Sequence, residues 1–296
     1  MSKIVEGAKL LAIQASPRRE GFTNQLMNIV LEGAGEVEGV DIEEIFLPDR
    51  RLEFCRGCFS CKNPPHHCVL RDDMGENGDG MLHRSLEDAN GIIFTLPTYL
   101  WSTNALTHTF FERCYPFLWS QQLNGMPFAY VTSAYNSGMH RESARSVEKW
   151  AFICSLKLIG GFSVHFAHLE EDREDLRELG RRCAQASVDD LIGRKEISQE
   201  DRYAQTVNES WDLPDLYLDN ITRGTGRKSD LLTTIGFERG WFKQPDAYPL
   251  LREADEIFRQ IIDKIDSGNS EEAMRLLSNA HRIWKDGTLI EYGRKP

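Results

Sequence analysis

Short apolar runs alternate with amphipathic stretches over the first two thirds of the chain. Such runs are typical of strands in a parallel sheet that is covered on both faces. The runs that predict strands are 10–13, 40–47, 89–96, 126–132 and 161–169. The stretches with helical periodicity are 24–35, 80–87, 104–118, 141–158 and 172–192. The alternation predicts an α/β fold, a doubly wound five-stranded parallel sheet with right-handed crossovers.

The loop after the first run carries hydroxyl, guanidinium and amide groups at Ser16, Arg18, Thr23 and Asn24. A loop between a strand and a helix N-terminus presents backbone N–H groups and the positive end of the helix dipole, which suits a phosphate. The loop matches neither the P-loop nor the dinucleotide fingerprint, and an ordinary polar loop is the alternative. From this loop we predict the strand order 2-1-3-4-5, with the charged run 40–47 at the edge, and a ligand at the carboxyl ends of strands one and three.

Aromatic, hydroxyl and amide side chains also follow the third and fourth strands, in the segments 97–104 and 133–138. A planar, partly polar heterocycle needs flat apolar walls with a few hydrogen-bonding groups. Three loops that meet at one sheet edge therefore predict a binding site for such a ligand. The alternative is that Tyr99 and Trp101 are buried packing residues.

A long connection, residues 48–80, follows the second strand and contains the pattern C-x2-C-x2-C-x6-C at Cys55, Cys58, Cys61 and Cys68. Zinc sites usually pair two C-x2-C units a dozen or more residues apart. Three thiols at x2 spacing resemble iron–sulfur ligation more closely. We interpret His66 and His67 in this Cys-rich loop (residues 48–80) as solvated, and the acidic pair Asp72-Asp73 as exposed.

The last hundred residues have a different pattern. Residues 196–245 show weak periodicity, and two apolar faces at 250–265 and 273–284 predict a helical hairpin. Asn269 and Glu272 form a capping box before the second helix, and Gly287 is its expected stop. We predict two domains, residues 1–195 and an extension at 196–296. The apolar faces of the extension favour a subunit contact, hence a homo-oligomer, either a homodimer or a homotetramer.

Composition narrows the class of protein. The chain has 296 residues, 41% of them hydrophobic, and a net charge of −11, which argues against nucleic-acid and anionic-membrane partners. The opening MSKIVEGAK lacks the apolar region of a signal peptide, so we expect a cytoplasmic protein. In that compartment the seven cysteines indicate metal, redox or buried roles rather than disulfides.

These motifs together resemble the flavodoxin-like NAD(P)H-dependent FMN reductases, and within them the iron–sulfur flavoproteins. The resemblance covers about residues 8–195. The matching segments are Ser16-Pro17-Arg18 with Gly21, Thr23 and Asn24; Cys55 to Cys61; Cys68 to Met74; Pro97-Thr98-Tyr99; and Phe111-Glu112-Arg113. The chain departs from the family pattern at Ala15 and Glu112, where Gly and Asp are frequent, and it has only Gly138 in the second glycine-rich loop.

The resemblance implies a role for each set of residues. Ser16, Arg18, Thr23 and Asn24 would bind the FMN phosphate. The isoalloxazine would lie along Pro97, Thr98, Tyr99, Leu100 and Trp101, and its other side would face Ser133, Tyr135 and Asn136. Cys55, Cys58, Cys61 and Cys68 would ligate a [4Fe–4S] cluster; free thiols and zinc are the alternatives.

The implied activity is an FMN-dependent oxidoreductase that passes electrons from NAD(P)H through FMN to a small-molecule or protein acceptor. The alternative is an electron-transfer iron–sulfur flavoprotein that is supplied by a ferredoxin-like partner and has no small substrate of its own. A non-enzymatic flavin- or metal-binding module of a larger assembly is the third hypothesis. The sequence leaves the acceptor, and the choice between NADH and NADPH, open.

Overall fold

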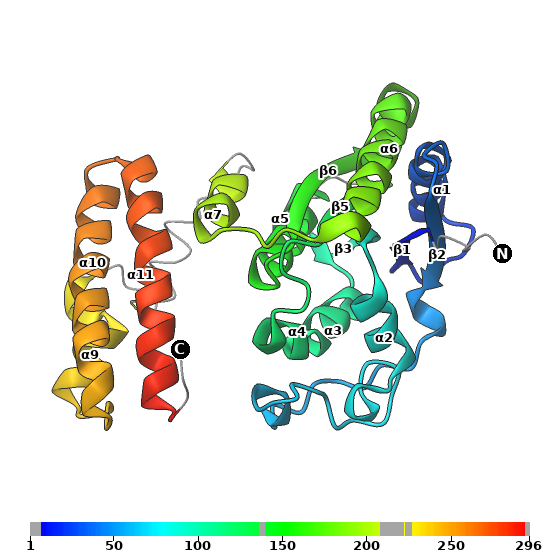
Figure 1. The fold of residues 1–296 in the computed structure, drawn as a ribbon. Coiled ribbons are helices and arrows are strands. Elements are labelled where there is room, and N and C mark those ends of the chain that lie inside the picture. Colours follow the sequence, from blue (N-terminus) through cyan, green and yellow to red (C-terminus); the bar gives the residue numbers. More distant parts are fainter. Residues whose placement is uncertain (1–6, 136–139, 208–221, 223–226, 294–296) are drawn as a thin grey trace. The chain divides into compact units, whose positions relative to one another are not determined.

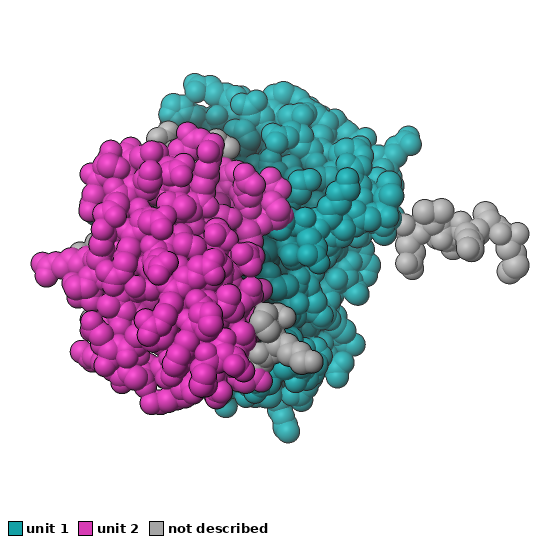
Figure 2. All heavy atoms as spheres, turned by 60° about the vertical axis from the view of Figure 1, so that its left-hand side comes forward, with its two compact units in different colours: residues 1–197 teal, residues 198–296 magenta. Residues whose placement is uncertain are grey.

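The computed structural model describes residues 7–135, 140–207, 222 and 227–293, and Figure 1 shows the fold. The chain divides into two compact units, Met1–Ile197 and Ser198–Pro296, which Figure 2 colours separately. No helix within the described residues combines the length and the apolar composition that crossing a membrane requires.

The first unit is built on a parallel sheet with the order β2-β1-β3-β5-β6. Its strands are β1 (Ala8–Gln14), β2 (Val40–Phe46), β3 (Gly91–Tyr99), β5 (Pro127–Ala134) and β6 (Lys157–His165). A two-residue strand, β4 (Ser102–Thr103), pairs antiparallel with the end of β3. The sheet confirms the predicted flavodoxin-like fold and strand order, with the charged strand β2 at the edge.

Two apolar cores cover the two faces of this sheet. Side chains alternate along each strand, so Leu10 and Ala12 of β1 enter one core while Leu11 and Ile13 enter the other. The core that contains Leu10 and Ala12 is closed by α1 (Phe22–Ala34) and α6 (Leu169–Gly193), and Figure 1 shows these two helices side by side. The helices of the opposite face are α2 (Met81–Asp88), α3 (Ala105–Arg113), α4 (Tyr115–Ser120) and α5 (His140–Ile153).

Helices α1 and α6 approach each other closely because both carry a glycine at their contact. A Cβ atom on Gly33 would lie 1.9 Å from the carbonyl oxygen of Arg177, and one on Gly180 would lie 1.9 Å from that of Val30. Both obstacles are backbone atoms, which cannot rotate away. The position of α1, and of the loop that leads into it, therefore depends on these two glycines.

Several element boundaries differ from the sequence-based expectation. The predicted helix 104–118 is interrupted at Cys114, because Pro116 has no N–H to donate to the carbonyl of Glu112. The predicted helix 141–158 ends at Ile153, and Ser155 adopts a left-handed φ of 57°. The last strand therefore begins at Lys157 instead of 161, and it ends at His165.

The second unit contains α7 (Gln199–Val207), α9 (Leu232–Glu238), α10 (Tyr248–Asp266) and α11 (Ser270–Glu291). The predicted hairpin is present as α10 and α11, and Asn269 caps α11 by accepting a hydrogen bond from the Glu272 N–H at 3.2 Å. The expected stop at Gly287 is wrong. This glycine lies inside α11, where a Cβ would come within 3.0 Å of Leu251 on α10.

Candidate functional site

The first loop (residues 16–24) joins β1 to α1 at the carboxyl edge of the sheet. Helix α1 begins at Phe22, with Gly21 as its N-cap, two residues earlier than predicted. Its first turn leaves backbone N–H groups without intrahelical acceptors and places the positive end of the helix dipole there. The structure therefore has the strand–loop–helix arrangement that the sequence predicts at this loop.

A cavity of about 480 Å³ opens beside the first loop. It is lined by Arg18, Glu20, Gly21, Phe22, Gln25, Tyr135 and Phe166. The rings of Phe22, Tyr135 and Phe166 form an aromatic trio, with centroids 4.4 Å apart for Tyr135–Phe166 and 5.3 Å for Phe22–Phe166. The cavity thus combines a cationic side chain, a helix N-terminus and flat apolar walls in a volume that suits a small ligand.

The predicted residues of the first loop divide into two groups. Arg18 is exposed and lines the cavity, and Asn24 is half-buried in the first turn of α1. Ser16 is buried, and its hydroxyl accepts a hydrogen bond from the Arg18 N–H at 3.2 Å. Thr23 is buried as well, and its hydroxyl lies 2.8 Å from that of Ser133. Ser16 and Thr23 therefore hold the loop in shape.

The loop after β3 is a tight hairpin whose tip is apolar. Thr98 pairs with Thr103 and Tyr99 with Ser102, which leaves Leu100 and Trp101 as the two turn residues. Both have left-handed φ values, 48° and 64°, and both are largely exposed. Large side chains in this conformation are strained by on the order of 1–3 kcal/mol each. Pairing along the hairpin holds this apolar tip at the sheet edge.

The remaining predicted residues come from the ends of β3 and β5. Pro97 is buried and lies opposite Ser133 in the sheet register. The Ser133 hydroxyl donates to the carbonyl of Leu96 at 3.3 Å, and the Thr98 hydroxyl lies 3.0 Å from that of Ser143. Asn136 lies outside the described residues.

The structure thus brings Arg18 and Tyr135 into one cavity and connects the first loop to the end of β5 through Thr23 and Ser133. Among the described residues, the lining of this cavity includes none of 97–101. It does include Phe22 and Phe166, which our sequence reasoning missed. Phe166 directly follows β6, but the predicted strand 161–169 includes it, and so the sequence pattern does not place it beyond a strand end, where ligands bind.

The four clustered cysteines lie in the Cys-rich loop around a 3₁₀ turn, Ser60–Lys62. Cys58 is exposed, and Cys55, Cys61 and Cys68 are half-buried. Burial, and then the neighbouring thiols of Cys68, Cys55 and Cys58, raise the pKa of Cys61 to about 11. The Ser60 hydroxyl, which donates to Cys58 Sγ at 3.4 Å, lowers the pKa of Cys58. The other three sulfur atoms are therefore near enough to that of Cys61 to influence its ionisation.

A buried ion pair holds this loop to the body of the unit. Arg113, at the end of α3, is almost fully buried and makes a bidentate contact with Asp72, 2.8 Å from Nη2 to Oδ1. It also donates to the carbonyl of Glu53 at 2.8 Å and lies 3.3 Å from Cys68 Sγ. The expectation that Asp72 is exposed is therefore wrong.

Asp72 is held as an anion in spite of its burial. Burial favours the neutral acid, but hydrogen bonds from Arg113 and from the Glu53 N–H outweigh it, so the pKa of Asp72 lies below 3.8. Its two oxygens accept hydrogen bonds from the N–H groups of Glu53 at 2.7 Å and Met74 at 3.2 Å. Asp72 thereby joins the beginning of the Cys-rich loop, at Glu53, to the part of the loop that follows the cysteines.

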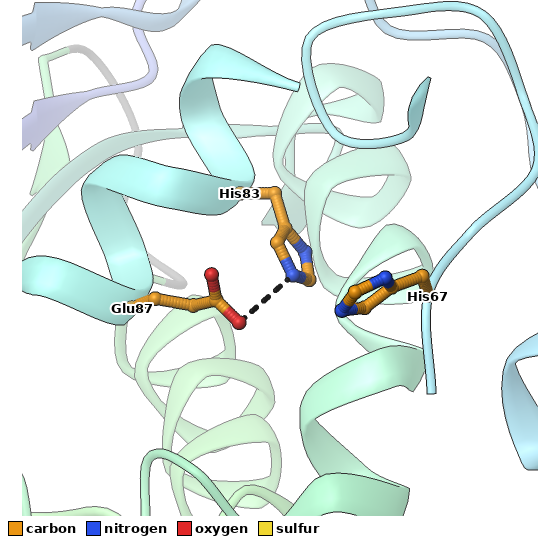
Figure 3. Close-up of side chains that lie close together, drawn as sticks. All are labelled: His67, His83 and Glu87. Carbon is orange, nitrogen blue, oxygen red and sulfur yellow. Dashed lines mark ion pairs between the residues drawn. The ribbon is translucent and has the colours of Figure 1, made fainter. Parts of the chain in front are cut away.

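The loop histidines are not simply solvated, contrary to our interpretation. His66 is half-buried, and its Nδ1 lies 3.1 Å from the carbonyl oxygen of Cys61. His67 is also half-buried and contacts His83 edge to face at a centroid distance of 5.4 Å, with Glu87 adjacent (Figure 3). The i, i+4 spacing of His83 and Glu87 on the predicted helix 80–87 is a sequence signal for that pair, but not for the approach of His67.

The other three cysteines are buried within the fold. Burial raises the pKa of Cys183 to about 12, and that of Cys114 well above its usual value. Such thiols behave as apolar packing groups. The chemistry of the cysteines therefore concentrates in the Cys-rich loop.

The chain is similar to several known proteins. The family model described as NADPH-dependent FMN reductase matches residues 8–170. An iron–sulfur flavoprotein of Archaeoglobus fulgidus is 26% identical over 187 residues, which cover 60% of this chain and 80% of that protein. One of Methanocaldococcus jannaschii is 29% identical over 153 residues, covering 51% and 76% respectively. A solved flavone reductase matches with a TM-score of 0.49 at 20% identity, over 64% of this chain and 66% of that one.

Proposed function

The chain belongs to the NADPH-dependent FMN reductase family, in the branch of the iron–sulfur flavoproteins, and on this premise we propose that it passes electrons from NAD(P)H through FMN to a small-molecule or protein acceptor. Membership makes it an FMN-dependent oxidoreductase. Beyond this, we propose its nicotinamide donor, its electron acceptor, its flavin-binding residues and its metal centre.

The observation that carries the proposal is the cavity beside the first loop. The guanidinium of Arg18, which lines the cavity, and the N-terminus of α1 supply the positive potential that a phosphate monoester needs. Glu20 lines the same cavity, so the anion would bind on the side of Arg18 and Gly21. Ser16 and Thr23 would keep the loop in the conformation that presents its N–H groups, and Asn24 would lie beside them.

The aromatic and hairpin residues would orient the flavin ring. Tyr135, Phe22 and Phe166 provide flat walls at the cavity. Residues 97–101, which form the end of β3 and the hairpin tip, would lie along the ring, with Ser133 and Asn136 on its other side. When bound, FMN supplies the chemistry by accepting a hydride from a nicotinamide and releasing electrons to an acceptor. The chain itself binds the FMN, orients its ring and shields it from water.

Arg18→Ala tests the phosphate assignment, with Arg19→Ala as the matched control. Arg19 is the neighbouring arginine, but it pairs with Asp49 and lies 4.1 Å from the ring centroid of Phe46. Loss of one charge-assisted contact should weaken FMN about 10- to 100-fold and leave riboflavin, which lacks the phosphate, nearly unchanged. Equal weakening of both ligands, or an equal effect of Arg19→Ala, would contradict the assignment. Fluorescence quenching of the flavin measures both affinities.

We further propose that Cys55, Cys58, Cys61 and Cys68 hold a [4Fe–4S] cluster. The donor set fits: four thiols gather in one loop, and the guanidinium of Arg113 beside Cys68 would offset part of the negative charge of thiolate ligands. Cysteines that ligate iron must be deprotonated, so iron binding at neutral pH would release protons from the thiols.

Anaerobic reconstitution with iron and sulfide tests this part. About four irons per chain and a cluster signal in electron paramagnetic resonance after reduction are expected. Cys58→Ala should abolish the signal, whereas Arg56→Ala, an exposed neighbour that pairs with Glu53, should keep it. A flavin spectrum without iron uptake would leave the cysteines as free thiols, and zinc uptake with four sulfur ligands would replace the cluster.

A second candidate, an electron carrier that receives electrons from a ferredoxin-like partner, is favoured by the surface of the Cys-rich loop. Cys58 is exposed there, and the side chains of Phe54 and Phe59 are 77% and 56% exposed. Such a surface suits a transient protein contact. Rapid bleaching of the flavin by NADH or NADPH without a protein donor would favour the reductase, and reduction only through a protein donor would favour the carrier.

A homodimer or homotetramer stays a prediction. The apolar faces of α10 and α11, from which it was drawn, are buried against each other within the second unit, at residues such as Phe258 and Leu277. Light scattering of the full chain measures the assembly directly. A monomer would exclude both states.

A further inference from the structure

Three side chains with metal-ligating atoms come together between the Cys-rich loop and α2. They are His67 from the loop and His83 and Glu87 from α2, and Figure 3 shows the two imidazole rings and the carboxylate facing one common space. One ligand atom from each lies within 4.8 Å of the other two. This group contains none of the four clustered cysteines and plays no part in the proposed flavin site.

His83 is fully buried, yet its ring nitrogens have unmet hydrogen-bonding capacity. Its side chain has 0% exposure, and neither ring nitrogen makes a regular hydrogen bond among the described residues, although Nε2 faces Glu87 Oε1 at 3.2 Å. Phe117 stacks on the ring at a centroid distance of 4.7 Å and an angle of 20°, which fixes its plane. Buried polar atoms without partners are uncommon, and each one requires a physical explanation.

The contact between His83 and Glu87 has the separation of two ligands of one ion. Nε2 lies 3.2 Å from Glu87 Oε1, and the two form an ion pair only when the imidazole is protonated (Figure 3). Zinc ligands at about 2.0–2.1 Å and tetrahedral angles lie about 3.3 Å apart. When Nε2 carries no proton, its lone pair and the carboxylate oxygen face each other as two acceptors, and an ion between them would bind both.

The chain presents the three ligands from two directions. His83 and Glu87 are four residues apart, so they lie on one face of α2. The ring of His67 lies over Gly78, where an added Cβ would come within 2.5 Å of it. The Glu87 side chain is 27% exposed, which leaves that side open for an ion and a water molecule to enter.

We propose that His67, His83 and Glu87 bind one divalent first-row transition-metal ion, with Zn²⁺ as the reference ion and water as a further ligand. Two imidazole nitrogens and one carboxylate oxygen form a donor set that zinc accepts, whereas calcium and magnesium prefer oxygen alone. The ion joins His67, the residue before Cys68, to α2. It therefore fixes one end of the segment that carries the four clustered cysteines, whether or not those cysteines bind a cluster.

Zinc uptake by the flavin-loaded full chain tests the proposal. After dialysis against Zn²⁺, mass spectrometry counts the ions, and X-ray absorption separates nitrogen and oxygen ligands at about 2.0–2.1 Å from sulfur ligands at about 2.3 Å. His67→Ala and Glu87→Gln are the test variants. Each has a matched control: His66→Ala in the same loop, and Asp88→Asn, the exposed neighbouring carboxylate that pairs with Lys9.

One zinc ion per chain with nitrogen and oxygen ligands is expected, and Cys58→Ala should retain it. Each test variant should weaken binding at least about 100-fold, since even loss of an outer partner costs 10- to 100-fold. Zinc should raise the melting temperature of the parent chain and of both controls but not that of Glu87→Gln, whose shape is conserved. Zinc held by sulfur alone, or zinc retained in both test variants, would overturn the proposal.

Discussion

The first loop and the Cys-rich loop leave neighbouring strands of one sheet, but they are held by different interactions. The first loop is short, and β1 and α1 fix both of its ends, so weak contacts such as Thr23 to Ser133 complete it. The Cys-rich loop is long and contains only 3₁₀ turns, and the buried pair of Arg113 and Asp72 holds it. A loop that lacks secondary structure thus depends on a few strong contacts, each of which is costly to lose.

Breaking the buried pair of Asp72 and Arg113 should cause the largest loss of stability, and it tests how the Cys-rich loop is held. Asp72→Asn leaves the guanidinium of Arg113 buried without a counter-charge, which should cost about 3–5 kcal/mol of unfolding free energy. Arg56→Ala, which removes an exposed pair with Glu53, should cost no more than about 1 kcal/mol. Urea denaturation measures both. If the two variants lost similar stability, the loop would not depend on the buried pair.

The packing of α1 gives the next largest effect, and it concerns the first loop. Gly180→Ala places a Cβ against the carbonyl of Val30, so α1 must shift, at a cost of about 1–3 kcal/mol. Because α1 carries the first turn of the proposed phosphate site, FMN affinity should fall as well. Gly193→Ala, at the end of the same helix, meets no atom within 4 Å and serves as the control. Unchanged stability and FMN affinity in Gly180→Ala would show that α1 tolerates displacement.

Acid should act on the Cys-rich loop before the first loop. The pKa of Asp72 is lowered in the folded state, so its contribution is complete above the ordinary carboxyl pKa of 3.8 and is lost as the pH falls below it. The stability difference between the parent chain and Asp72→Asn should therefore shrink below pH 3.8. Hydrogen exchange of residues 48–80, followed against pH, measures the opening. A difference that stays constant down to pH 2 would rule out this charge as its source.

The hydroxyl contact in the first loop should have the smallest effect. Thr23→Val removes one neutral hydrogen bond and should cost about 0.5–1.5 kcal/mol, because Ser133 keeps its contact with the carbonyl of Leu96. A double-mutant cycle with Ser133→Ala isolates the pair. A coupling energy above 2 kcal/mol would mean that the first loop, like the Cys-rich loop, depends on one strong contact.

The sequence predicted the sheet because its signals are local. Apolar runs and helical periodicity identify strands and helices without knowledge of their neighbours. The rule for parallel sheets then placed the first loop at the correct edge, and Arg18 and Tyr135 do line one cavity there. The errors arose where a local pattern was ambiguous. Residues 157 and 158 continue a helical pattern but belong to β6, and the predicted strand 161–169 extends past the end of β6 and so includes Phe166.

Within the Cys-rich loop the sequence indicated the donor set but not the packing. The spacing of the four cysteines is visible in the chain, whereas the burial of Asp72 depends on Arg113, forty-one residues away along the chain. The proximity of His67 to His83 depends equally on how the loop returns to α2. No pattern in neighbouring residues encodes such contacts.

The sequence by itself determined the α/β architecture, the strand order and the family, because periodicity, turn residues and motif spacing are properties of short segments. Only the tertiary structure decided which polar groups meet: Arg113 with Asp72, Thr23 with Ser133, and His67 with His83 and Glu87. The reason is physical. Burial of a charge or an imidazole is set by the free-energy balance of desolvation against its partners, and those partners come from distant parts of the chain.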